Sequence, residues 1–399
     1  MSLTAAQKLF APISLARAQK AAEQVKLKTR PDNIPLAFGL PFPESFPINS
    51  LVTAAQSALT QEGTQALQYF GGPSIPKLRD LIVDRLNSRG FGITKDEILV
   101  TTGSSQAIDL TNKLFLCAGD RMAVEAPTFF AALKDFQASG AEVKGIPVTD
   151  DGMDVQYLAD WLKSERKAGR PGIKLLYVIA NFQNPTGTTL SLESRHALLD
   201  LASTYDFIIL EDDAYGELYF DEPAPPALKS LDKEGRVVYT GTFSKIVAPG
   251  VRLGWAVASP DIIAALSSLK TDGGTAQLSQ AIVYHFCAAN SLDDRVRWLR
   301  SEYKKRWEVM RSALIEYMPK GSHFTDATGG FFTWLTVPGI NTSVMYPAAV
   351  ENGVTYVEGS SFFADPRGHE SMRLCFSFCD EQTLREGIRR LADTVKSYK

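Results

Sequence analysis

From residue 97 onward the chain alternates short apolar runs with amphipathic segments, and this alternation limits the folds open to it. The apolar runs are rich in β-branched and aromatic residues, which fit a pleated sheet. Strands that alternate with helices predict a largely parallel sheet sandwiched by helices, an α/β fold. The predicted strands are EILVTT (97–102), RMAVEA (121–126), EVKGIPV (142–148), IKLLYVIA (173–180), FIILEDDAY (207–215) and VVY (237–239).

The length of the chain predicts a second, smaller domain. The chain has 399 residues, and single hydrophobic cores stop growing near about 250 to 300 residues. Beyond Pro260 the pattern becomes helical, with one long amphipathic segment predicted from about 278 to 317, and the tail returns to strands before a last helix from about 381 to 398. We expect an N-terminal segment at 1–45, weakly helical up to residue 30, a large domain at 46–290 and a small α+β domain at 291–399.

Composition and charge exclude several classes of function. A formal net charge of -3 gives no basic surface for nucleic acid. No apolar run approaches the ~20 residues of a membrane helix, and the N-terminus lacks the pattern of a secretory signal, so we expect a cytoplasmic protein with no membrane partner. Cys375 and Cys379 are predicted to be buried thiols rather than disulfide or zinc ligands, and the chain holds only four histidines, so no metal is expected.

Chemically distinct side chains follow five of the predicted strands. In open parallel sheets, ligands bind outside the carboxyl ends of the strands, so these groups are expected to meet in one crevice. Of the acids at the end of FIILEDDAY, one is expected to be a solvated loop residue. The groups that follow the strands are Gly103 to Gln106, Phe129, Asn184, Asp212 and Lys245.

Lys245 lies in TGTFSKIVAPGVRLGW (240–255), directly after a predicted strand. An ammonium among apolar neighbours such as Phe243 and Ile246 is costly to desolvate, so it finds a partner, loses its proton or reacts covalently. A Schiff base with an aldehyde is the third of these outcomes. The planar fork of Arg252 suits a phosphate, and an aldehyde with a phosphate suggests pyridoxal phosphate. The alternative is a core strand followed by a turn whose two cations reach solvent.

Other candidates also have purely structural explanations. The start of a helix at Ser104, Ser105 and Gln106 offers N–H groups to an anion, or else Ser104 merely caps the helix. Arg373 lies in the middle of the predicted strand MRLCFSF, where it is either a structural ion-pair partner or a carboxylate receptor. Tyr69 precedes a glycine and proline turn and could be a core aromatic residue.

Taken together, these motifs resemble those of fold-type I, class I/II pyridoxal-phosphate-dependent aminotransferases over nearly the whole chain. The resemblance is greatest to the branch that contains 2-aminoadipate, kynurenine and aromatic amino-acid aminotransferases. It implies a large PLP-dependent transferase-like domain and ping-pong exchange of an amino group between a 2-oxo acid and an L-amino acid with an aromatic, bulky aliphatic or 2-aminoadipate-like side chain. The matching motifs are LQYFGGPSIPKLR, TTGSSQAIDL, VEAPTFF, NFQNPTG, EDDAYGELYF, TFSKIVAPGVRLGW and MRLCFSF, in family order.

The resemblance also assigns roles to residues at the cofactor ring. Lys245 matches the lysine that forms the Schiff base and then moves the substrate proton, and Asp212 matches the aspartate that pairs with the pyridine nitrogen. Asn184 and Tyr215 match the pair that hydrogen-bonds the ring 3′ oxygen. Phe129 takes the place of the aromatic residue that stacks on the ring.

The remaining matches concern the phosphate and the substrate. Tyr69 matches a tyrosine that reaches the phosphate in the other subunit, which implies a homodimer with shared sites. Arg373 matches the receptor for the substrate α-carboxylate, aided by Asn184, and Gly39 matches a backbone contact to substrate. The residues that match the phosphate cup are Ser104, Ser105, Gln106, Thr242, Ser244 and Arg252.

The chain departs from the branch at two positions. Ser74 stands where a glycine is common, and Ala22 stands where the aminoadipate group often has an arginine, with Arg17 out of register. Apolar residues near the site are expected either to line a pocket for aromatic or bulky aliphatic donors or to belong to the core. They are Phe38, Leu40, Phe331 and Trp334.

Two other functions share these motifs. A lyase, cyclase or oxidase of a specialised amino acid would use the same residues to hold the cofactor ring. A cofactor-binding transcription regulator would carry an additional N-terminal DNA-binding domain, and we expect none because the resemblance begins by about residue 30.

Overall fold

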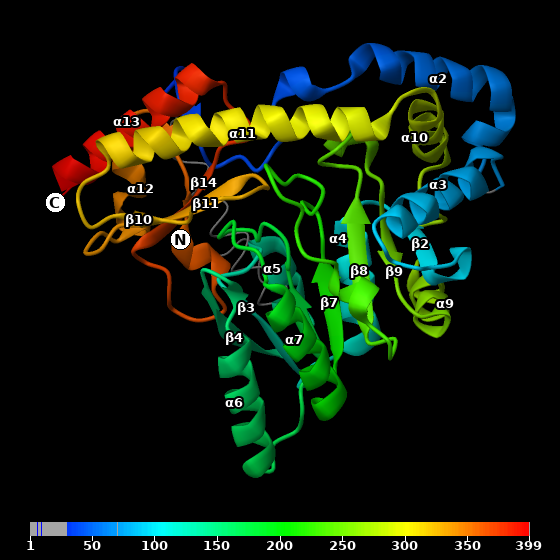
Figure 1. The fold of residues 1–399 in the computed structure, drawn as a ribbon, viewed down its shortest axis with the longest axis horizontal. Helices are drawn as coiled ribbons and strands as arrows, with labels where there is room; N and C mark the ends of the chain where they lie inside the picture. Colours follow the sequence, from blue (N-terminus) through cyan, green and yellow to red (C-terminus); the bar gives the residue numbers. More distant parts are fainter. Residues whose placement is uncertain (1–5, 7–8, 10–29, 70, 399) are drawn as a thin grey trace.

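The computed structural model describes residues 6, 9, 30–69 and 71–398, so the helical prediction for residues 1–30 lies almost entirely outside the described residues. The large domain is built on a sheet with helices on both faces, and a smaller group of sheets and helices lies beside it (Figure 1). The long helix α11 (Leu292–Tyr317) runs across the top of both parts (Figure 1).

The central sheet has eight strands in the order β2-β9-β8-β7-β6-β3-β4-β5. Strands β3, β4, β6, β7 and β8 pair in parallel, β9 is antiparallel to both β2 and β8, and β5 is antiparallel to β4. The prediction of a mostly parallel α/β sheet is therefore confirmed. The strands are β2 (Ile98–Thr101), β3 (Arg121–Ala126), β4 (Glu142–Thr149), β5 (Gly152–Met153), β6 (Leu175–Val178), β7 (Ile208–Asp212), β8 (Val237–Thr242) and β9 (Gly254–Val257).

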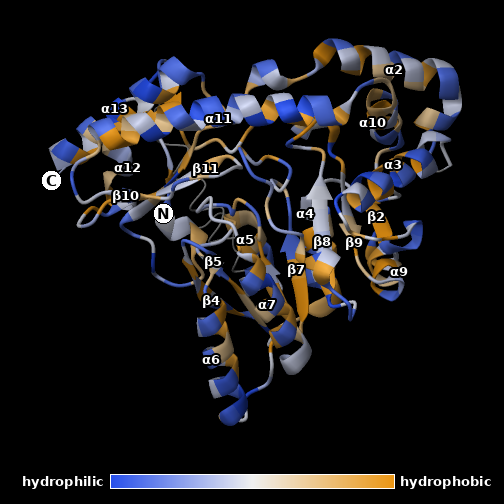
Figure 2. Ribbon diagram, in the orientation of Figure 1, coloured by the Kyte–Doolittle hydropathy of each residue, from blue (hydrophilic) through white to orange (hydrophobic). Residues whose placement is uncertain are grey.

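Neighbouring residues of the inner strands enter two different cores, because successive side chains point to opposite faces of a sheet. On β6, Leu175 and Tyr177 pack under α4 (Ser104–Phe115), α5 (Phe130–Ala138) and α9 (Pro260–Leu269). Leu176 and Val178 pack under α6 (Val155–Lys167), α7 (Leu192–Tyr205) and α8 (Leu228–Leu231). Both faces are thus covered, and β7 is accordingly apolar at its start and becomes polar only toward its carboxyl end (Figure 2).

The smaller part contains a four-stranded antiparallel sheet in the order β10-β11-β14-β13 and a parallel pair, β1 with β12. Pairing of β1 with β12 joins the segment after residue 30 to the C-terminal region. Two helices, α12 (Thr342–Glu351) and α13 (Glu381–Tyr398), complete this part. The strands are β1 (Ile34–Pro35), β10 (His323–Phe324), β11 (Phe332–Thr336), β12 (Val354–Thr355), β13 (Val357–Glu358) and β14 (Ser371–Cys375).

The single helical segment predicted from 278 to 317 is wrong, because it consists of two helices. Helix α10 (Gln277–Ala289) ends before Asn290, which is extended, and α11 begins after Ser291. The Ser291 side chain accepts a hydrogen bond from the backbone N–H of Asp294, which caps the new helix. Among the described residues, no helix has both the length and the apolar character needed to cross a bilayer.

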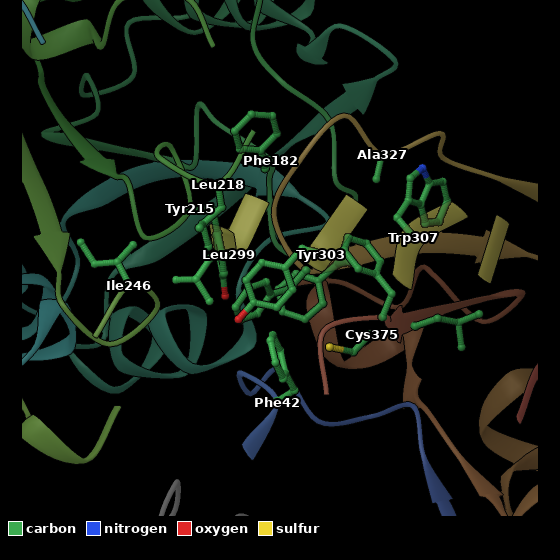
Figure 3. Close-up of a cluster of buried hydrophobic side chains, with 14 of the residues drawn as sticks. Phe42, Phe182, Tyr215, Leu218, Ile246, Leu299, Tyr303, Trp307, Ala327 and Cys375 are labelled. Carbon is green, nitrogen blue, oxygen red and sulfur yellow. The ribbon is translucent and has the colours of Figure 1, made fainter. Parts of the chain in front are cut away.

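A mixed core of aromatic and aliphatic side chains lies beneath α11. Figure 3 shows Leu299 and Tyr303 of α11 beside Phe42, Ile246 and other side chains that come from distant parts of the chain. This core joins α11 to the ends of the central strands.

Helices α2 (Ile48–Glu62) and α3 (Ser74–Ser88) pack against α10 at the opposite end from the small sheet (Figure 1). Short 3₁₀ turns complete the fold: η2 (Pro43–Ser45), η3 (Gly63–Leu67), η4 (Lys95–Glu97), η5 (Pro249–Val251) and η6 (Gly359–Phe362).

Candidate active site

A cavity of about 330 Å³ lies at the carboxyl ends of the central strands. Its walls come from the ends of β3, β6, β7 and β8, the start of α4, the segment around Gly39, β11 and β14. Twelve of the fourteen predicted site residues line it: Gly39, Ser104, Ser105, Phe129, Asn184, Asp212, Tyr215, Thr242, Ser244, Lys245, Arg252 and Arg373.

Lys245 lies in the turn that follows β8, and the buried Phe243 and Ile246 on either side anchor this turn. Its Nζ donates a hydrogen bond of 3.0 Å to the carbonyl of Gly39, a neutral acceptor. Burial lowers the pKa of Lys245 to about 8, and the nearby Arg373 acts in the same direction while Asp212 opposes it. The amine can therefore be neutral close to physiological pH, as a nucleophile or base requires.

Asp212 is the last residue of β7, and it lines the cavity at the carboxyl end of this strand. The Tyr177 hydroxyl donates to Oδ2 at 2.8 Å, and the Thr240 hydroxyl donates to Oδ1 at 3.2 Å. Burial raises the pKa of Asp212 to about 6 despite these two donors. A buried carboxylate held in this way is suited to a cationic ring nitrogen.

The expectation that one of the three acids is solvated is wrong, because all three are buried. Glu211 accepts the backbone N–H groups of Leu228 and Lys229 at 2.8 and 2.9 Å, so it holds the start of α8. The carboxylate of Asp213 accepts a hydrogen bond from Nη2 of Arg89, with 2.9 Å between Oδ2 and Nη2. Burial would raise the pKa of Asp213, but Arg89 and neighbouring donors outweigh it and hold this pKa below its usual value.

The start of α4 provides an anion site at the other end of the cavity. Gly103 occupies the N-cap position with φ 76°, and no side chain caps the helix, so Ser104 is not the cap that one interpretation expected. A Cβ at Gly103 would lie 2.8 Å from Nη2 of Arg252, so glycine allows this guanidinium to approach the helix. The free N–H groups, the helix dipole and Arg252 together suit a phosphate dianion.

Arg373 occupies the centre of β14 and points into the cavity from the small domain. Its Nη1 donates to Asn184 Oδ1 at 2.9 Å and its Nη2 donates to the carbonyl of Ala37 at 2.8 Å, whereas its buried Nε has no hydrogen-bond partner in the described part of the chain. The guanidinium lies over the ring of Phe332, 4.2 Å from its centroid. All of these contacts are to neutral groups, which favours a receptor for a carboxylate over a structural ion pair.

These residues fit pyridoxal phosphate on the structure's own evidence: a lysine of lowered pKa, a buried carboxylate, an uncapped helix start beside an arginine, and an orphaned guanidinium nitrogen. The family model described as aminotransferase class I and II matches residues 33–391. The chain belongs to this family.

Three similar aminotransferases align with this aminotransferase over nearly its whole length. It is 42% identical to the aromatic-amino-acid aminotransferase 1 of Thermococcus litoralis, over 98% of this chain and 94% of that protein. The multiple substrate aminotransferase from Thermococcus profundus superposes with a TM-score of 0.92 at 39% identity, over 99% of both chains. The Pyrococcus horikoshii kynurenine aminotransferase, solved with PMP, gives 0.91 at 38% identity, over 99% of this chain and 98% of that one. The predicted family, enzyme activity and pyridoxal phosphate cofactor are confirmed.

Two predicted site residues of the aminotransferase lie outside the cavity. Gln106 accepts the N–H of Thr102 at 2.8 Å and donates to Asp272 Oδ2 at 2.7 Å, so its side chain braces the start of α4 from outside. The side chain of Tyr69 is 72% exposed and lies beside the loop at Gly273.

Sequence reasoning missed several residues that line the cavity, chiefly Phe130 and Phe332. Each lies next to an aromatic residue that the sequence analysis did consider, Phe129 and Phe331 respectively. Phe331, considered for the pocket, is fully buried in the core, whereas Phe332, one position later on β11, faces the cavity. A shift of one residue along a strand exchanges its two faces, and only the register with β14 decides between them.

Proposed function

We propose that this aminotransferase takes its amino group from L-amino acids with aromatic or bulky aliphatic side chains and passes it to a 2-oxo acid. One observation carries the proposal. Lys245 Nζ, held by a neutral carbonyl, and the unpartnered Nε of Arg373 border the same cavity. A base and a carboxylate receptor at one site are what removal of a proton from an α-amino acid requires.

The proposed cofactor contacts are those that the family resemblance assigns, and they are supported by the presence of these residues in the cavity wall. When bound, pyridoxal phosphate supplies an electron sink for the negative charge that develops on the substrate Cα. Asp212 would pair with the ring nitrogen, Asn184 and Tyr215 with the ring 3′ oxygen, and Phe129 would stack on the ring face. The phosphate would be held by Ser104, Ser105, Thr242, Ser244 and Arg252.

Two side chains would perform the work on the substrate. Arg373 would bind the α-carboxylate through its free Nε and so fix the Cα beside Lys245. The neutral Nζ of Lys245 would then remove the Cα proton and deliver it to carbon C4′ of the bound cofactor. With the acceptor oxo acid, the same nitrogen would move a proton from C4′ to Cα. The lowered pKa of Lys245, about 8, keeps part of the amine unprotonated near neutral pH.

The donor class is inferred from the remaining walls of the cavity. Leu40, Phe130 and Phe332 contribute apolar surface. The cationic side chains that line it, within the described residues, are Lys245, Arg252 and Arg373, and each has a proposed role with the cofactor or the α-carboxylate. This favours an uncharged donor side chain over a 2-aminoadipate-like one, in keeping with the aromatic amino-acid substrate named for the Thermococcus litoralis relative.

We further propose a homodimer in which Tyr69 reaches the phosphate of the partner's cofactor. Large apolar side chains on and after α2 are exposed in the single chain: Ile48, Val52, Leu59 and Leu67, at 44 to 66%. Tyr69 follows directly on this surface. Several large apolar side chains exposed on one helix and the turn after it favour burial against a second copy.

The proposal is tested by adding L-amino acids one at a time to the yellow holoenzyme without any oxo acid. Loss of the aldehyde-form absorbance and gain of the amine-form absorbance, with one equivalent of oxo acid released, would support transfer and identify the donors. Oxo acid released in excess, with the cofactor unchanged, would instead indicate a lyase or oxidase. Lys245→Ala should abolish turnover, and full turnover in this variant would refute the assigned mechanism.

A further inference from the structure

The turn that carries Lys245 is attached to α11 by one arginine. Arg295 Nε donates to the carbonyl of Ile246 at 2.6 Å, and its Nη2 donates to the carbonyl of Val247 at 3.1 Å. These are the two residues that follow the lysine. The same Nη2 also donates to the carbonyl of Ser45 at 2.7 Å.

Ser45 is at the end of the short segment that contains Gly39, whose carbonyl accepts the hydrogen bond from Lys245. Gly39, whose carbonyl receives Lys245 Nζ, lies six positions before Ser45 in the same irregular stretch. Toward the small sheet this stretch is held by Arg373 at Ala37 and by the Ser377 hydroxyl at Leu40, at 2.8 and 2.7 Å. Its other end is held by η2, where the Ser45 hydroxyl donates to Phe42, and by Arg295.

Arg295 therefore holds the lysine turn and the acceptor segment in one fixed relation. Its three hydrogen-bond acceptors are all backbone carbonyls, and within the described residues no carboxylate forms an ion pair with it. A planar guanidinium can serve three carbonyls from one position, which a lysine ammonium cannot do in the same geometry. Phe42, Ile246 and Leu299, a residue of α11, belong to the same buried core (Figure 3).

We propose that Arg295 is a positioning residue for the transamination reaction, which sets the placement of Lys245 relative to the substrate Cα. This inference rests on the proposed role of Lys245 as the base. Loss of the three hydrogen bonds would let the turn and the Gly39 segment move apart. A displacement near 1 Å at a reacting group costs as much as roughly 100-fold in rate.

The test compares Arg295→Met, Arg295→Lys and the control Arg297→Met in the holoenzyme. Arg297 lies on the same helix, its side chain is 72% exposed, and its ion pair is with Asp294. We measure kcat, KM for the donor, the isotope effect on kcat for a donor deuterated at Cα, cofactor content and Tm. Arg295→Met should lower kcat at least tenfold with KM within threefold and a larger isotope effect, because proton transfer becomes slower. Arg295→Lys should recover part of kcat, and Arg297→Met should match the wild type.

A kcat within twofold of wild type, or an unchanged isotope effect with activity lost in proportion to cofactor content, would overturn the inference. If Arg295→Met does not fold, Arg295→Lys decides by the same criteria. Failure of the proposed function would look different, because Lys245→Ala would then keep its turnover whatever Arg295 does.

Discussion

The lowered pKa of Lys245 predicts a fast reaction between the apoenzyme and its cofactor near neutral pH. A lysine with its ordinary pKa of 10.5 is neutral in roughly one molecule in 3,000 at pH 7, whereas a pKa of about 8 leaves about one in ten neutral. Because only the neutral amine attacks an aldehyde, burial should increase the rate of covalent capture roughly 300-fold at this pH.

The assay mixes apoenzyme with saturating pyridoxal phosphate and follows the absorbance change by stopped flow between pH 6.5 and 10.5. Below pH 8 the first-order rate should rise about tenfold per pH unit, and above about pH 8 it should level off. Arg373→Met should move the midpoint upward, because the charge of Arg373 contributes to lowering the pKa of Lys245. Lys245→Ala is the control and should show no covalent capture.

A rate that keeps rising to pH 10 without a plateau would refute the reasoning, because it would mean that burial does not depress the pKa of Lys245. A midpoint unchanged in Arg373→Met would instead leave desolvation as the cause and remove the contribution assigned to Arg373.

Three further outcomes are expected. Arg373→Met should lower kcat/KM for L-amino acids by about 100-fold or more, since a charge-assisted carboxylate contact is lost. The rate for the matching amine without a carboxylate should fall far less, only as much as the raised pKa of Lys245 requires. Gly103→Ala should weaken cofactor binding at least about tenfold in a titration of the apoenzyme, because φ is 76° and the added Cβ would lie 2.8 Å from Arg252. Arg89→Met should lower the free energy of unfolding by roughly 3 to 5 kcal/mol at pH 7 by leaving the buried Asp213 unpaired. As the pH falls through the lowered pKa of Asp213, the difference in unfolding free energy between the variant and the wild type should shrink, because a protonated carboxyl needs no cation. Denaturant unfolding of both proteins, at pH 7 and at a pH below the pKa of Asp213, checks this.

Several expectations of the sequence remain predictions. The domain limits at 1–45, 46–290 and 291–399, the cytoplasmic location and the role of Gln106 in the phosphate cup are among them. The side chain of Gln106 turns away from the cavity toward Asp272, and this contact spans 166 residues of sequence. Local pattern placed Gln106 at a helix start but carried no information on the loop that its side chain meets.

The sequence by itself determined the alternation of the parallel strands with helices and the groups that follow these strands, because apolar periodicity and turn residues are local properties. It also identified the family, since the motifs stand in order along the chain. Only the tertiary structure decided which of Phe331 and Phe332 faces the cavity, that all three acids after β7 are buried, and that Arg295 holds the turn of Lys245. Each of these depends on strand register or on contacts between residues far apart in the chain, and such contacts form only when the whole core packs.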